Sequence, residues 1–364
     1  MLEALARQLA DRRGAAVAHF CPTPGRLAER LADAGDVPVC VYGRRHRTRD
    51  VVDVSRAAAR LRFQSRRFEA DMLVGSGTRG FLYVAGAATR MGLRTVQIIH
   101  DPVERRDPLN RLFSALRAPD VTLFSSRRPL SESPGHIQRR PRASVVQAAI
   151  DADRIDRCLA EADSAGAHDH DAGAFVMVAR IQEHKGQDVL LEAFKLVVEQ
   201  IPAARLVFVG EPSPVADPLW VKGLYERVRA YGLSESVRFT GFLPDCALYR
   251  LLARSLCLVH SAVHESFGLV LLEAMYLRKP VLTTATEGPS AIVEPGRTGR
   301  IVPIGGVRQL ADAMLELLAS PALAETLGEA GRRRMLQRFP PDAMTNDFSR
   351  AISDVVRVGS CGRT

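Results

Sequence analysis

Short apolar runs that alternate with helical stretches constrain the fold of this chain more than any other feature. One series of such runs occupies residues 1–150, and a second series of the same kind begins near residue 174. Strands that alternate with helices along a chain form parallel sheets built from strand–helix–strand units. The expected strands are 37–43, 71–76, 93–100, 120–126 and 143–150 in the first series and 174–180, 204–210, 236–242, 256–262 and 279–285 in the second.

The length of the chain and a polar break near its middle predict two α/β domains. A chain of 364 residues is longer than one hydrophobic core ordinarily serves. The stretch 158–173 is small, polar and aperiodic, so we expect it to link a first domain, 1–157, to a second, 174–338. Ligands of such domains bind at the carboxyl ends of the strands, and we expect the site in the cleft between the domains.

The composition is that of a globular protein. Hydrophobic residues make up 46% of the chain, and no apolar run reaches the roughly 20 residues that a bilayer requires. The stretch 1–14 lacks the basic start and apolar middle of a signal peptide, so we expect a cytoplasmic protein. No Cys-x-x-Cys pair occurs, and we expect reduced thiols rather than disulfides or a zinc site. The six cysteines are Cys21, Cys40, Cys158, Cys246, Cys257 and Cys361.

Positive charge is concentrated in the first half of the chain. Residues 1–150 carry 26 arginines, no lysine and 14 acidic residues, a net charge of +12, whereas the remainder carries 24 basic and 27 acidic residues. This excess favours an anionic partner such as a membrane surface, a phosphorylated substrate or nucleic acid. A genome that encodes arginine wherever a surface cation is tolerated is an equal alternative. Nucleic acid ranks last, because aromatic residues are not interleaved with the arginines.

The stretch 49–68 combines apolar residues at helical spacing with Arg56, Arg60 and Arg67 on another face. This pattern is typical of a solvated helix that packs on a sheet. A helix that lies on an anionic membrane is the less favoured alternative.

The segment HESFGLVLLEAMYLRKP, residues 264–280, contains two carboxylates in an otherwise apolar run. Ser266 is a candidate N-cap for a helix that begins near Phe267, and Gly268 lets a ligand approach the backbone. A helix N-terminus with free N–H groups suits a diphosphate. Glu273 follows within the same helix, where apolar neighbours on both sides imply a buried carboxylate that requires hydrogen-bond donors.

Two cations follow the first strand of the second series. Arg180 lies near the end of strand 174–180, and Lys185 lies in the following loop. Fixed cations in a site shielded from water stabilise the negative charge that develops on a leaving diphosphate. The sequence therefore predicts that Arg180 and Lys185 act on such a group.

Taken together, these motifs resemble the retaining GT-B glycosyltransferases of family 4, which include bacterial mannosyl- and glucosyltransferases. The resemblance covers nearly all of 174–345 and joins the Arg180/Lys185 pair, the glutamate–seven residues–glutamate motif and a downstream TGRIVP, in the order of the family. Over 1–150 the resemblance is looser. It implies two Rossmann-like domains that face a cleft, with a C-terminal helix, 339–364, that crosses back to the first domain.

The resemblance also implies the reaction and the roles of the site residues. The reaction is transfer of a sugar from a nucleoside-diphosphate sugar to an acceptor hydroxyl with retention of configuration, in the synthesis of a glycan, glycolipid or other glycoconjugate. Catalytic roles would fall to His100, Arg180, Lys185 and Glu265. Donor contacts would come from Arg180, Lys185, Glu265, Ser266, Phe267, Gly268, Leu269 and Glu273.

Within that set, Arg180 and Lys185 would bind the pyrophosphate, Glu265 the hydroxyls of the transferred sugar and Glu273 the ribose. His100 would lie beside the donor sugar and the acceptor. The alternative for the glutamates is that Glu273 pairs with Arg278 or Lys279 and that Glu265 is solvated. For His100, the alternative is a strand-end histidine bonded to neighbouring backbone.

We expect neither a cofactor nor a metal ion. The triplet DAD at 151–153 reads as a helix start, and HDHD at 168–171 lies in the polar linker. The glycine-rich stretch 75–80 either lines the acceptor side or forms an ordinary tight turn. The expected acceptor is a sugar, a lipid-linked molecule or a small molecule, and a lipid-linked acceptor would bring the protein to the inner face of the membrane.

The chain departs from the family at its start. Met1 already lies within what reads as the first helix, so we expect the N-terminal domain to lack the first strand and the glycine-rich loop of the family. This departure motivates two rival readings. One is a non-catalytic nucleotide-binding protein or partner subunit of the same fold, and the other is a phosphorylase or sugar-phosphate synthase of that fold.

Overall fold

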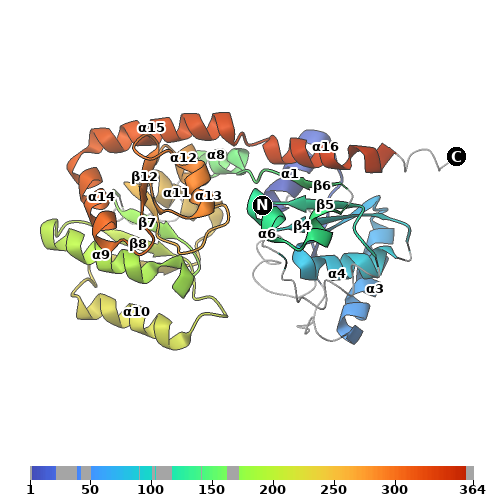
Figure 1. Ribbon diagram of the computed structural model, residues 1–364, viewed down its shortest axis with the longest axis horizontal. Coiled ribbons are helices and arrows are strands. Elements are labelled where there is room, and N and C mark those ends of the chain that lie inside the picture. Colours follow the sequence, from blue (N-terminus) through green and yellow to red (C-terminus); the bar gives the residue numbers. More distant parts are fainter. Residues whose placement is uncertain are drawn as a thin grey trace. The chain divides into compact units, whose positions relative to one another are not determined.

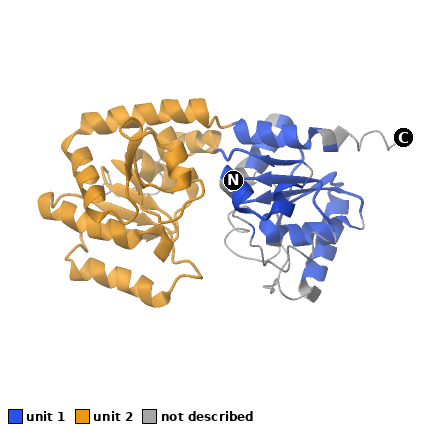
Figure 2. Cartoon of the chain, in the orientation of Figure 1, with its two compact units in different colours: residues 1–149, 342–364 blue, residues 150–341 orange. Residues whose placement is uncertain are grey.

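The computed structural model describes residues 2–21, 39–41, 51–89, 91–100, 103, 117–140, 142–161 and 172–357. The chain forms two compact units, one of residues 1–149 and 342–364 and the other of residues 150–341 (Figure 2). All paired strands in both units run parallel, as the alternation of strands and helices predicts.

Unit 1 is built on a four-stranded parallel sheet in the order β3-β4-β5-β6, and a separate parallel pair joins β1 to β2. The strands are β1 (His19–Cys21), β2 (Val39–Val41), β3 (Met72–Ser76), β4 (Arg94–Ile99), β5 (Val121–Phe124) and β6 (Ala143–Val145). The unit also contains α1 (Leu2–Arg13), α3 (Val51–Arg67), α4 (Gly77–Ala88), α6 (Arg127–Glu132), α7 (Gly135–Gln138) and α16 (Ala343–Arg357).

Helix α3 packs within unit 1 through its apolar face. The sequence predicted that this face would pack on a sheet or, less favoured, lie on a membrane. Val54, Ala58 and Leu61 are buried, and Val54 and Leu61 join a core with residues of α4. Arg56 and Arg60 remain exposed on the other face. The apolar stripe therefore stabilises the unit, as in an ordinary solvated helix.

The end of the chain returns to unit 1. Met344 and Phe348 of α16 are buried in a core with Leu5 of α1 and with residues of β4 and β5. The backbone N–H of Gln147 donates a hydrogen bond to Asp347, at 3.2 Å. The resemblance implied this return of the last helix, which lies beside α1 (Figure 1). Apolar packing holds it there.

Unit 2 is a six-stranded parallel sheet in the order β12-β11-β10-β7-β8-β9. The strands are β7 (Phe175–Val178), β8 (Leu206–Val209), β9 (Val237–Gly241), β10 (Cys257–His260), β11 (Val281–Thr284) and β12 (Gly299–Val302). The series expected from the sequence ended at β11, so β12 is an addition. It lies within TGRIVP, where Gly299 weakens the apolar pattern. A Cβ on Gly299 would lie 2.2 Å from the carbonyl oxygen of Val281, so the strand pairing requires this glycine.

Helices cover both faces of this sheet. Side chains alternate along a strand, so Phe175 and Met177 join one core while Val176 joins another. The first core includes α9 (Gln187–Gln200), α10 (Pro218–Ala230) and α14 (Val307–Ala319). The second includes α8 (Ala152–Ala160), α11 (Asp245–Arg254), α12 (Leu269–Tyr276) and α15 (Pro321–Arg338). The unit also contains the 3-10 helix η2 (Glu183–Lys185) and α13 (Glu287–Ile292).

The strand order of unit 2 reverses beside β7. The chain proceeds from β7 through β8 to β9 on one side, and then returns to place β10, β11 and β12 on the other. Crossovers on the two sides of such a point leave a crevice at the carboxyl ends of the strands, where open α/β sheets bind ligands. The loops after β7 and β10 therefore border the expected ligand site.

Helix α8 belongs to unit 2. Asp151 caps it by accepting a hydrogen bond from the backbone N–H of Arg154 at 3.1 Å, so DAD does open a helix. Ala152 and Ile155 are buried in the second core of unit 2. The units thus divide ahead of α8, at Ile150, and not after residue 157. Most of the expected linker, with HDHD at 168–171, lies outside the described residues.

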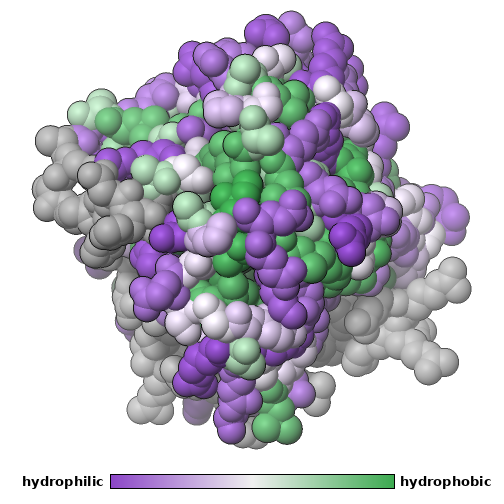
Figure 3. All heavy atoms as spheres, turned by 90° about the vertical axis from the view of Figure 1, so that its left-hand side faces the viewer, coloured by the Kyte–Doolittle hydropathy of each residue, from purple (hydrophilic) through white to green (hydrophobic). Residues whose placement is uncertain are grey.

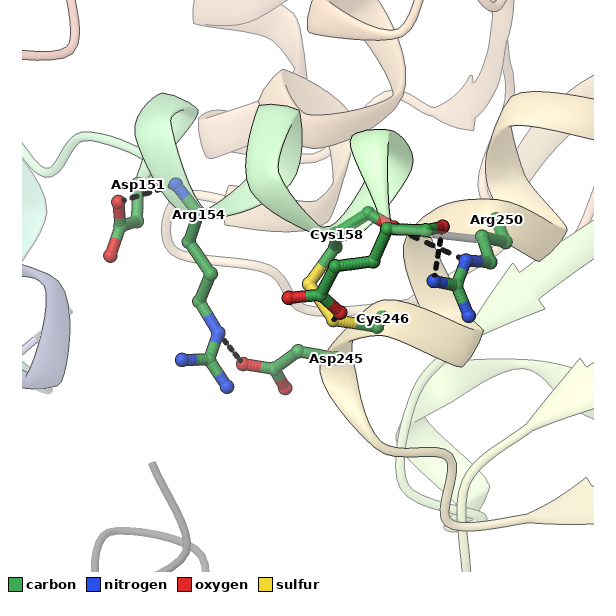
Figure 4. Close-up of a disulfide and its surroundings, with 7 residues drawn as sticks. Asp151, Arg154, Cys158, Asp245, Cys246 and Arg250 are labelled. Atoms are coloured by element: carbon green, nitrogen blue, oxygen red, sulfur yellow. Dashed lines mark hydrogen bonds and ion pairs between the residues drawn. A yellow bond between two sulfur atoms is a disulfide. The ribbon is translucent and has the colours of Figure 1, made fainter. Parts of the chain in front are cut away.

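The expectation of six reduced cysteines is wrong for one pair. Cys158 of α8 and Cys246 of α11 form a disulfide across 88 residues of sequence (Figure 4). Arg154 pairs with Asp245 beside it at 2.7 Å, and Arg250 Nε donates to the carbonyl oxygen of Cys158 at 3.1 Å. A separation of this length gives no local motif. Only the packing of α8 on α11 brings the two sulfur atoms together. The side chains of Cys21 and Cys257 are buried, whereas those of Cys40 and Cys361 lie outside the described part.

Within the described residues, no helix is both long and apolar enough to span a bilayer. Hydrophobic and hydrophilic residues are interleaved on the face of the molecule that Figure 3 shows.

Candidate functional site

The loops that follow β7 and β10 are fastened to each other. Gly186, after η2, has a φ of +72°, and a Cβ there would lie 2.2 Å from the carbonyl oxygen of Ser261. Ser261 Oγ donates a hydrogen bond to the carbonyl oxygen of Gly186 at 2.7 Å, and Val263 N–H donates to that of His184 at 2.8 Å. Only glycine combines this backbone conformation with so close an approach. The contact fixes the position of Lys185 relative to the end of β10.

Lys185, Glu265 and His260 form the chemical centre of this junction. Lys185 Nζ lies 2.9 Å from Glu265 Oε2, and His260 Nε2 lies 3.2 Å from the same oxygen. Burial raises the pKa of Glu265, but the hydrogen bond from His260 and the charge of Lys185 outweigh it and lower the pKa to about 2. Glu265 is therefore ionised and held by two donors. This excludes the alternative of a solvated carboxylate.

The loop that carries Glu265 is fixed from its other side by α13. Gly288 N–H donates to the carbonyl oxygen of Glu265 at 3.1 Å, and a Cβ on Gly288 would lie 2.5 Å from the Cα of Phe267. The backbone of residues 265–267 is thus packed directly against a glycine. Neither Glu265 nor Phe267 can shift far without breaking this contact.

Ser266 does not cap the following helix, so that prediction is wrong. The N-cap of α12 is Gly268, with a φ of +91°, and the helix begins at Leu269 rather than near Phe267. The turn around Gly268 carries the chain into the helix without a side-chain cap. The third N–H group of α12, that of Leu271, donates to the carbonyl oxygen of Gly268 at 3.0 Å. The two N–H groups before it, those of Leu269 and Val270, have no carbonyl partner within the helix, so they remain suited to an anion.

Glu273 is the fifth residue of α12 and is half-buried, so the expectation of a buried carboxylate is only partly met. Burial and the negative charge of Glu273 raise the pKa of Tyr249 on the neighbouring helix α11. Of Arg278 and Lys279, the two alternative partners of Glu273, Arg278 contacts Glu329, with its Nε at 2.7 Å. Glu273 thus lies slightly more than one turn from the helix N-terminus.

The loop after β7 carries an excess of positive charge. The pKa of His184 is lowered by burial and by the nearby charges of Lys185, Arg180 and His264. Arg180 is exposed, and no carboxylate in the described part of the chain forms an ion pair with it. Gln187 Nε2 donates to the carbonyl oxygen of Arg180 at 2.9 Å and so fixes the backbone there. An anion at this edge of the sheet would meet Arg180 and Lys185 together.

The sequence analysis missed His260 and Gln187. Both side chains are buried at this edge of the sheet, with His260 2% and Gln187 1% exposed. His260 ends a strand of a parallel sheet, which is where residues of a ligand site belong. The position of His260 at the end of a strand was therefore the sequence signal that could have marked it as a site residue. Gln187 follows Gly186 at the start of α9, and nothing in the local pattern marked it.

His100 lies in unit 1, whereas the other predicted site residues lie in unit 2. It follows β4, and its Nε2 lies 2.9 Å from Ser76 Oγ at the end of β3. Ser125 Oγ donates to its carbonyl oxygen at 3.4 Å. The carboxyl ends of β3, β4 and β5 thus meet around His100. Asp101 lies outside the described residues.

The glycine-rich stretch 75–80 has a packing role. A Cβ on Gly75 would lie 2.7 Å from the Cα of Phe81, so a side chain there would push α4 off the end of β3. This supports the ordinary tight turn over an acceptor-lining loop. No cluster of three or more His, Cys, Asp or Glu side chains that could hold a metal ion occurs among the described residues.

Part of the chain is similar in sequence to known proteins. Residues 160–334, nearly all of unit 2, match the family described as "Glycosyl transferases group 1". Among curated proteins, the chain is similar to the putative glycosyltransferase EpsD of Bacillus subtilis, with 31% identity over 45% of this chain and 41% of that protein. It is also similar to the D-inositol 3-phosphate glycosyltransferase of Kribbella flavida, with 35% identity over 44% of this chain and 38% of that protein. The matched part is thus less than half the length of these relatives.

Solved structures match the whole fold. The Anabaena protein Alr3699/HepE, solved in complex with UDP and glucose, has a TM-score of 0.74 at 19% identity, covering 97% of this chain and 94% of that protein. Sucrose-phosphate synthase from Thermosynechococcus elongatus has a TM-score of 0.67 at 19% identity, covering 94% of this chain and 96% of that protein. The fold of two Rossmann-like parallel-sheet domains, expected from the motifs, is confirmed.

Proposed function

We propose that this chain transfers a sugar from a nucleoside-diphosphate sugar to an acceptor hydroxyl, because residues 160–334 match the family described as "Glycosyl transferases group 1". The observation that carries the proposal is the meeting of Lys185, Glu265 and the N-terminus of α12 beside the reversal of strand order in unit 2. Cations and free N–H groups suit a diphosphate, and the adjoining carboxylate suits the hydroxyls of a sugar.

In this proposal the donor lies along the carboxyl edge of the unit 2 sheet. Arg180, Lys185 and the first N–H groups of α12 bind the diphosphate, and Ser266, Phe267, Gly268 and Leu269 supply the backbone around it. Glu265 accepts hydrogen bonds from the sugar, and Glu273, one turn further along α12, accepts them from the ribose. The complexes of HepE with UDP and with UDP-glucose support a uridine nucleotide as the first donor to test.

Lys185 changes partner in this scheme. Without donor its Nζ pairs with Glu265, and the diphosphate offers it a more highly charged partner close by. When the leaving nucleoside diphosphate separates from the sugar, negative charge grows on the oxygen that Arg180 and Lys185 face. Stabilisation of that charge lowers the barrier to transfer.

We propose that configuration is retained, with the acceptor hydroxyl attacking from the face that the leaving group vacates. The bond from the anomeric carbon to the diphosphate oxygen breaks, the bond to the acceptor oxygen forms, and the acceptor proton passes to the leaving diphosphate. Glu265 is unsuited to act as a general base, because its pKa of about 2 makes it a weak proton acceptor at neutral pH. We assign it to binding. The anomeric proton of the product in a nuclear magnetic resonance (NMR) spectrum tests this stereochemistry, since an inverted product would exclude the mechanism.

We further propose that no metal ion is required, because Arg180, Lys185 and a helix N-terminus already face the diphosphate. Transfer that is unchanged by EDTA supports this, and activity that EDTA removes and Mg²⁺ restores would exclude it. His100, in unit 1, is the proposed contact for the acceptor. The proposed location is cytoplasmic, with contact at the inner face of the membrane if the acceptor is lipid-linked.

A thermal-shift panel with UDP, GDP and ADP and their common sugar conjugates tests donor binding. A true ligand stabilises the folded state by mass action, by about 2.7 kcal/mol at a hundredfold excess over Kd. We expect Lys185→Ala and Glu273→Ala to remove most of this stabilisation. Undiminished stabilisation of both variants would refute the site assignment.

Turnover separates the rival functions. Donor binding without transfer to any sugar, lipid-linked or small-molecule acceptor would favour a non-catalytic nucleotide-binding protein. Turnover only with free phosphate or sugar phosphates as acceptor would favour a phosphorylase or a sugar-phosphate synthase. We expect transfer to a hydroxyl instead.

A further inference from the structure

His260 takes no part in the function proposed above, yet it is one of the least exposed polar residues of the site. It is the last residue of β10, and its side chain is 3% exposed. Thr283 Oγ1 and Thr284 Oγ1 donate to its carbonyl oxygen at 3.1 and 3.4 Å. Strand pairing and these two hydroxyls hold the backbone that carries the imidazole.

The two nitrogens of the ring have different surroundings. Nε2 lies 3.2 Å from Glu265 Oε2, whereas Nδ1 is buried and has no hydrogen-bond partner among the described residues. A protonated Nδ1 would be a buried donor without an acceptor, which is costly, and more so on a charged ring. The arrangement therefore favours a proton on Nε2, which is donated to Glu265.

Two donors therefore share one oxygen of Glu265. Lys185 Nζ lies 2.9 Å from Oε2, the oxygen that His260 also contacts. Among the described residues, the other oxygen, Oε1, has a single long contact, from the N–H of Phe267 at 3.4 Å. Lysine is a flexible chain that can turn to a diphosphate, but the imidazole is fixed at the end of a strand.

We propose that His260 is a positioning residue, which holds Oε2 of Glu265 so that Oε1 is directed to a hydroxyl of the transferred sugar. The inference rests on the proposed function, because it takes a nucleoside-diphosphate sugar as the ligand. His260 keeps the carboxylate in place when Lys185 turns to the diphosphate. His260 therefore contributes to the affinity for the sugar part of the donor and not to the affinity for the nucleotide.

Two substitutions of His260 and one control separate positioning from folding. His260→Leu removes the donor, and His260→Gln keeps an N–H near the position of Nε2. Val259→Ala opens a cavity in the same strand on its opposite face, away from Glu265. Thermal unfolding of all three variants measures the structural cost of each change.

Calorimetry with UDP and GDP then measures the affinity for the nucleotide alone. Calorimetry with UDP-glucose and GDP-mannose measures the affinity for the complete donor. For the nucleotide sugar that binds the wild type, we expect His260→Leu to weaken affinity about tenfold, as for one lost hydrogen bond to a charged group. We expect the affinity for the matching diphosphate to stay within about twofold, His260→Gln to recover most of the loss, and Val259→Ala to change neither affinity. Equal weakening of the diphosphate and the nucleotide sugar, or no weakening of either, would overturn the proposal.

A ligand-free measurement distinguishes failure of this inference from failure of the proposed function. Carbon-13 NMR of the Glu265 carboxyl, assigned with Glu265→Gln, follows its titration in the presence of the facing groups Lys185 and His260. We expect the pKa to rise in His260→Leu and to stay low in His260→Gln. An unchanged pKa in His260→Leu would refute the positioning role. If the pKa rises but the wild type binds no nucleotide sugar, the proposed function fails, and with it the directing of Oε1 to a sugar.

Discussion

The low pKa of Glu265 couples the site to the stability of the folded chain. Its folded pKa of about 2 lies below the ordinary value of 4.5, so ionised Glu265 stabilises the fold at neutral pH. This contribution, at most about 3 kcal/mol, is lost as the pH falls from near 4.5 towards 2. We expect the free energy of unfolding of Glu265→Gln to differ from that of wild type less at pH 3 than at pH 7. A difference that stays constant between these pH values in urea titrations would contradict the depressed pKa.

The contact of Gly186 with Ser261 gives a second prediction, with a matched control in the same unit. Gly186→Ala places a Cβ 2.2 Å from a carbonyl oxygen at a positive φ, whereas Gly232 has a similar φ of +69° in open space. We expect Gly232→Ala to cost about 1 kcal/mol, the ordinary cost of alanine in this conformation. Gly186→Ala should cost clearly more and also weaken nucleotide binding, because Lys185 is displaced. Equal losses in denaturant unfolding would show that the contact carries no strain.

The disulfide between α8 and α11 is expected to stabilise unit 2. A cross-link restricts the unfolded chain, and natural disulfides typically contribute about 2–4 kcal/mol. We expect dithiothreitol to lower the midpoint of thermal unfolding of the wild type. A Cys158→Ser/Cys246→Ser double variant should unfold at that lower midpoint with or without the reductant. A wild-type midpoint that is insensitive to reduction, with both thiols free by alkylation and mass analysis, would contradict a stabilising cross-link.

The elements also show what the sequence could predict. Strands such as 256–262 and 279–285 were located because buried parallel strands are short apolar runs, and β10 and β11 lie within them. The start of α12 was placed two residues too early, because the serine at 266 suggested a cap while the turn at Gly268 determines the start. Strand β12 was missed because Gly299 weakens its apolar pattern. This glycine is required by the close approach of the Val281 carbonyl oxygen, a contact that the sequence does not reveal.

The site residues also divide into those that a local motif predicted and those that depend on contacts the sequence does not reveal. Lys185 and Glu265 were predicted by local motifs, and the structure brings them to 2.9 Å. The disulfide was missed because tertiary packing alone brings its two cysteines together, whereas the one signal for His260 was its position at the end of a strand. Cys158 and Cys246, in particular, meet only when α8 packs on α11. Local patterns predict elements and motifs, whereas the contacts between distant segments decide which side chains share a site.

Across the whole molecule, the chain crosses between its units twice, so the C-terminal helix α16 belongs to unit 1 while α15 belongs to unit 2. Phe348 of α16 is buried in unit 1, and Leu327 of α15 is buried in the core of unit 2. Because the core around Phe348 lies within unit 1 and the core around Leu327 lies within unit 2, we expect them to lose stability separately. Phe348→Ala should cost about 3–5 kcal/mol in unit 1, and Leu327→Ala about 2–5 kcal/mol in unit 2.

Amide hydrogen exchange measured by mass spectrometry tests this separation. In Phe348→Ala we expect faster exchange in α1, β4 and β5, because their residues share the core with α16, while β7 to β12 keep their protection. Leu327→Ala should give the opposite pattern. Leu327→Ala should weaken nucleotide binding and Phe348→Ala should not, because the proposed donor-binding residues lie in unit 2. These residues are Arg180, Lys185 and Glu265. If either substitution speeds exchange equally in both units, the chain unfolds as one cooperative body, which would contradict the prediction. Both substitutions would then weaken nucleotide binding.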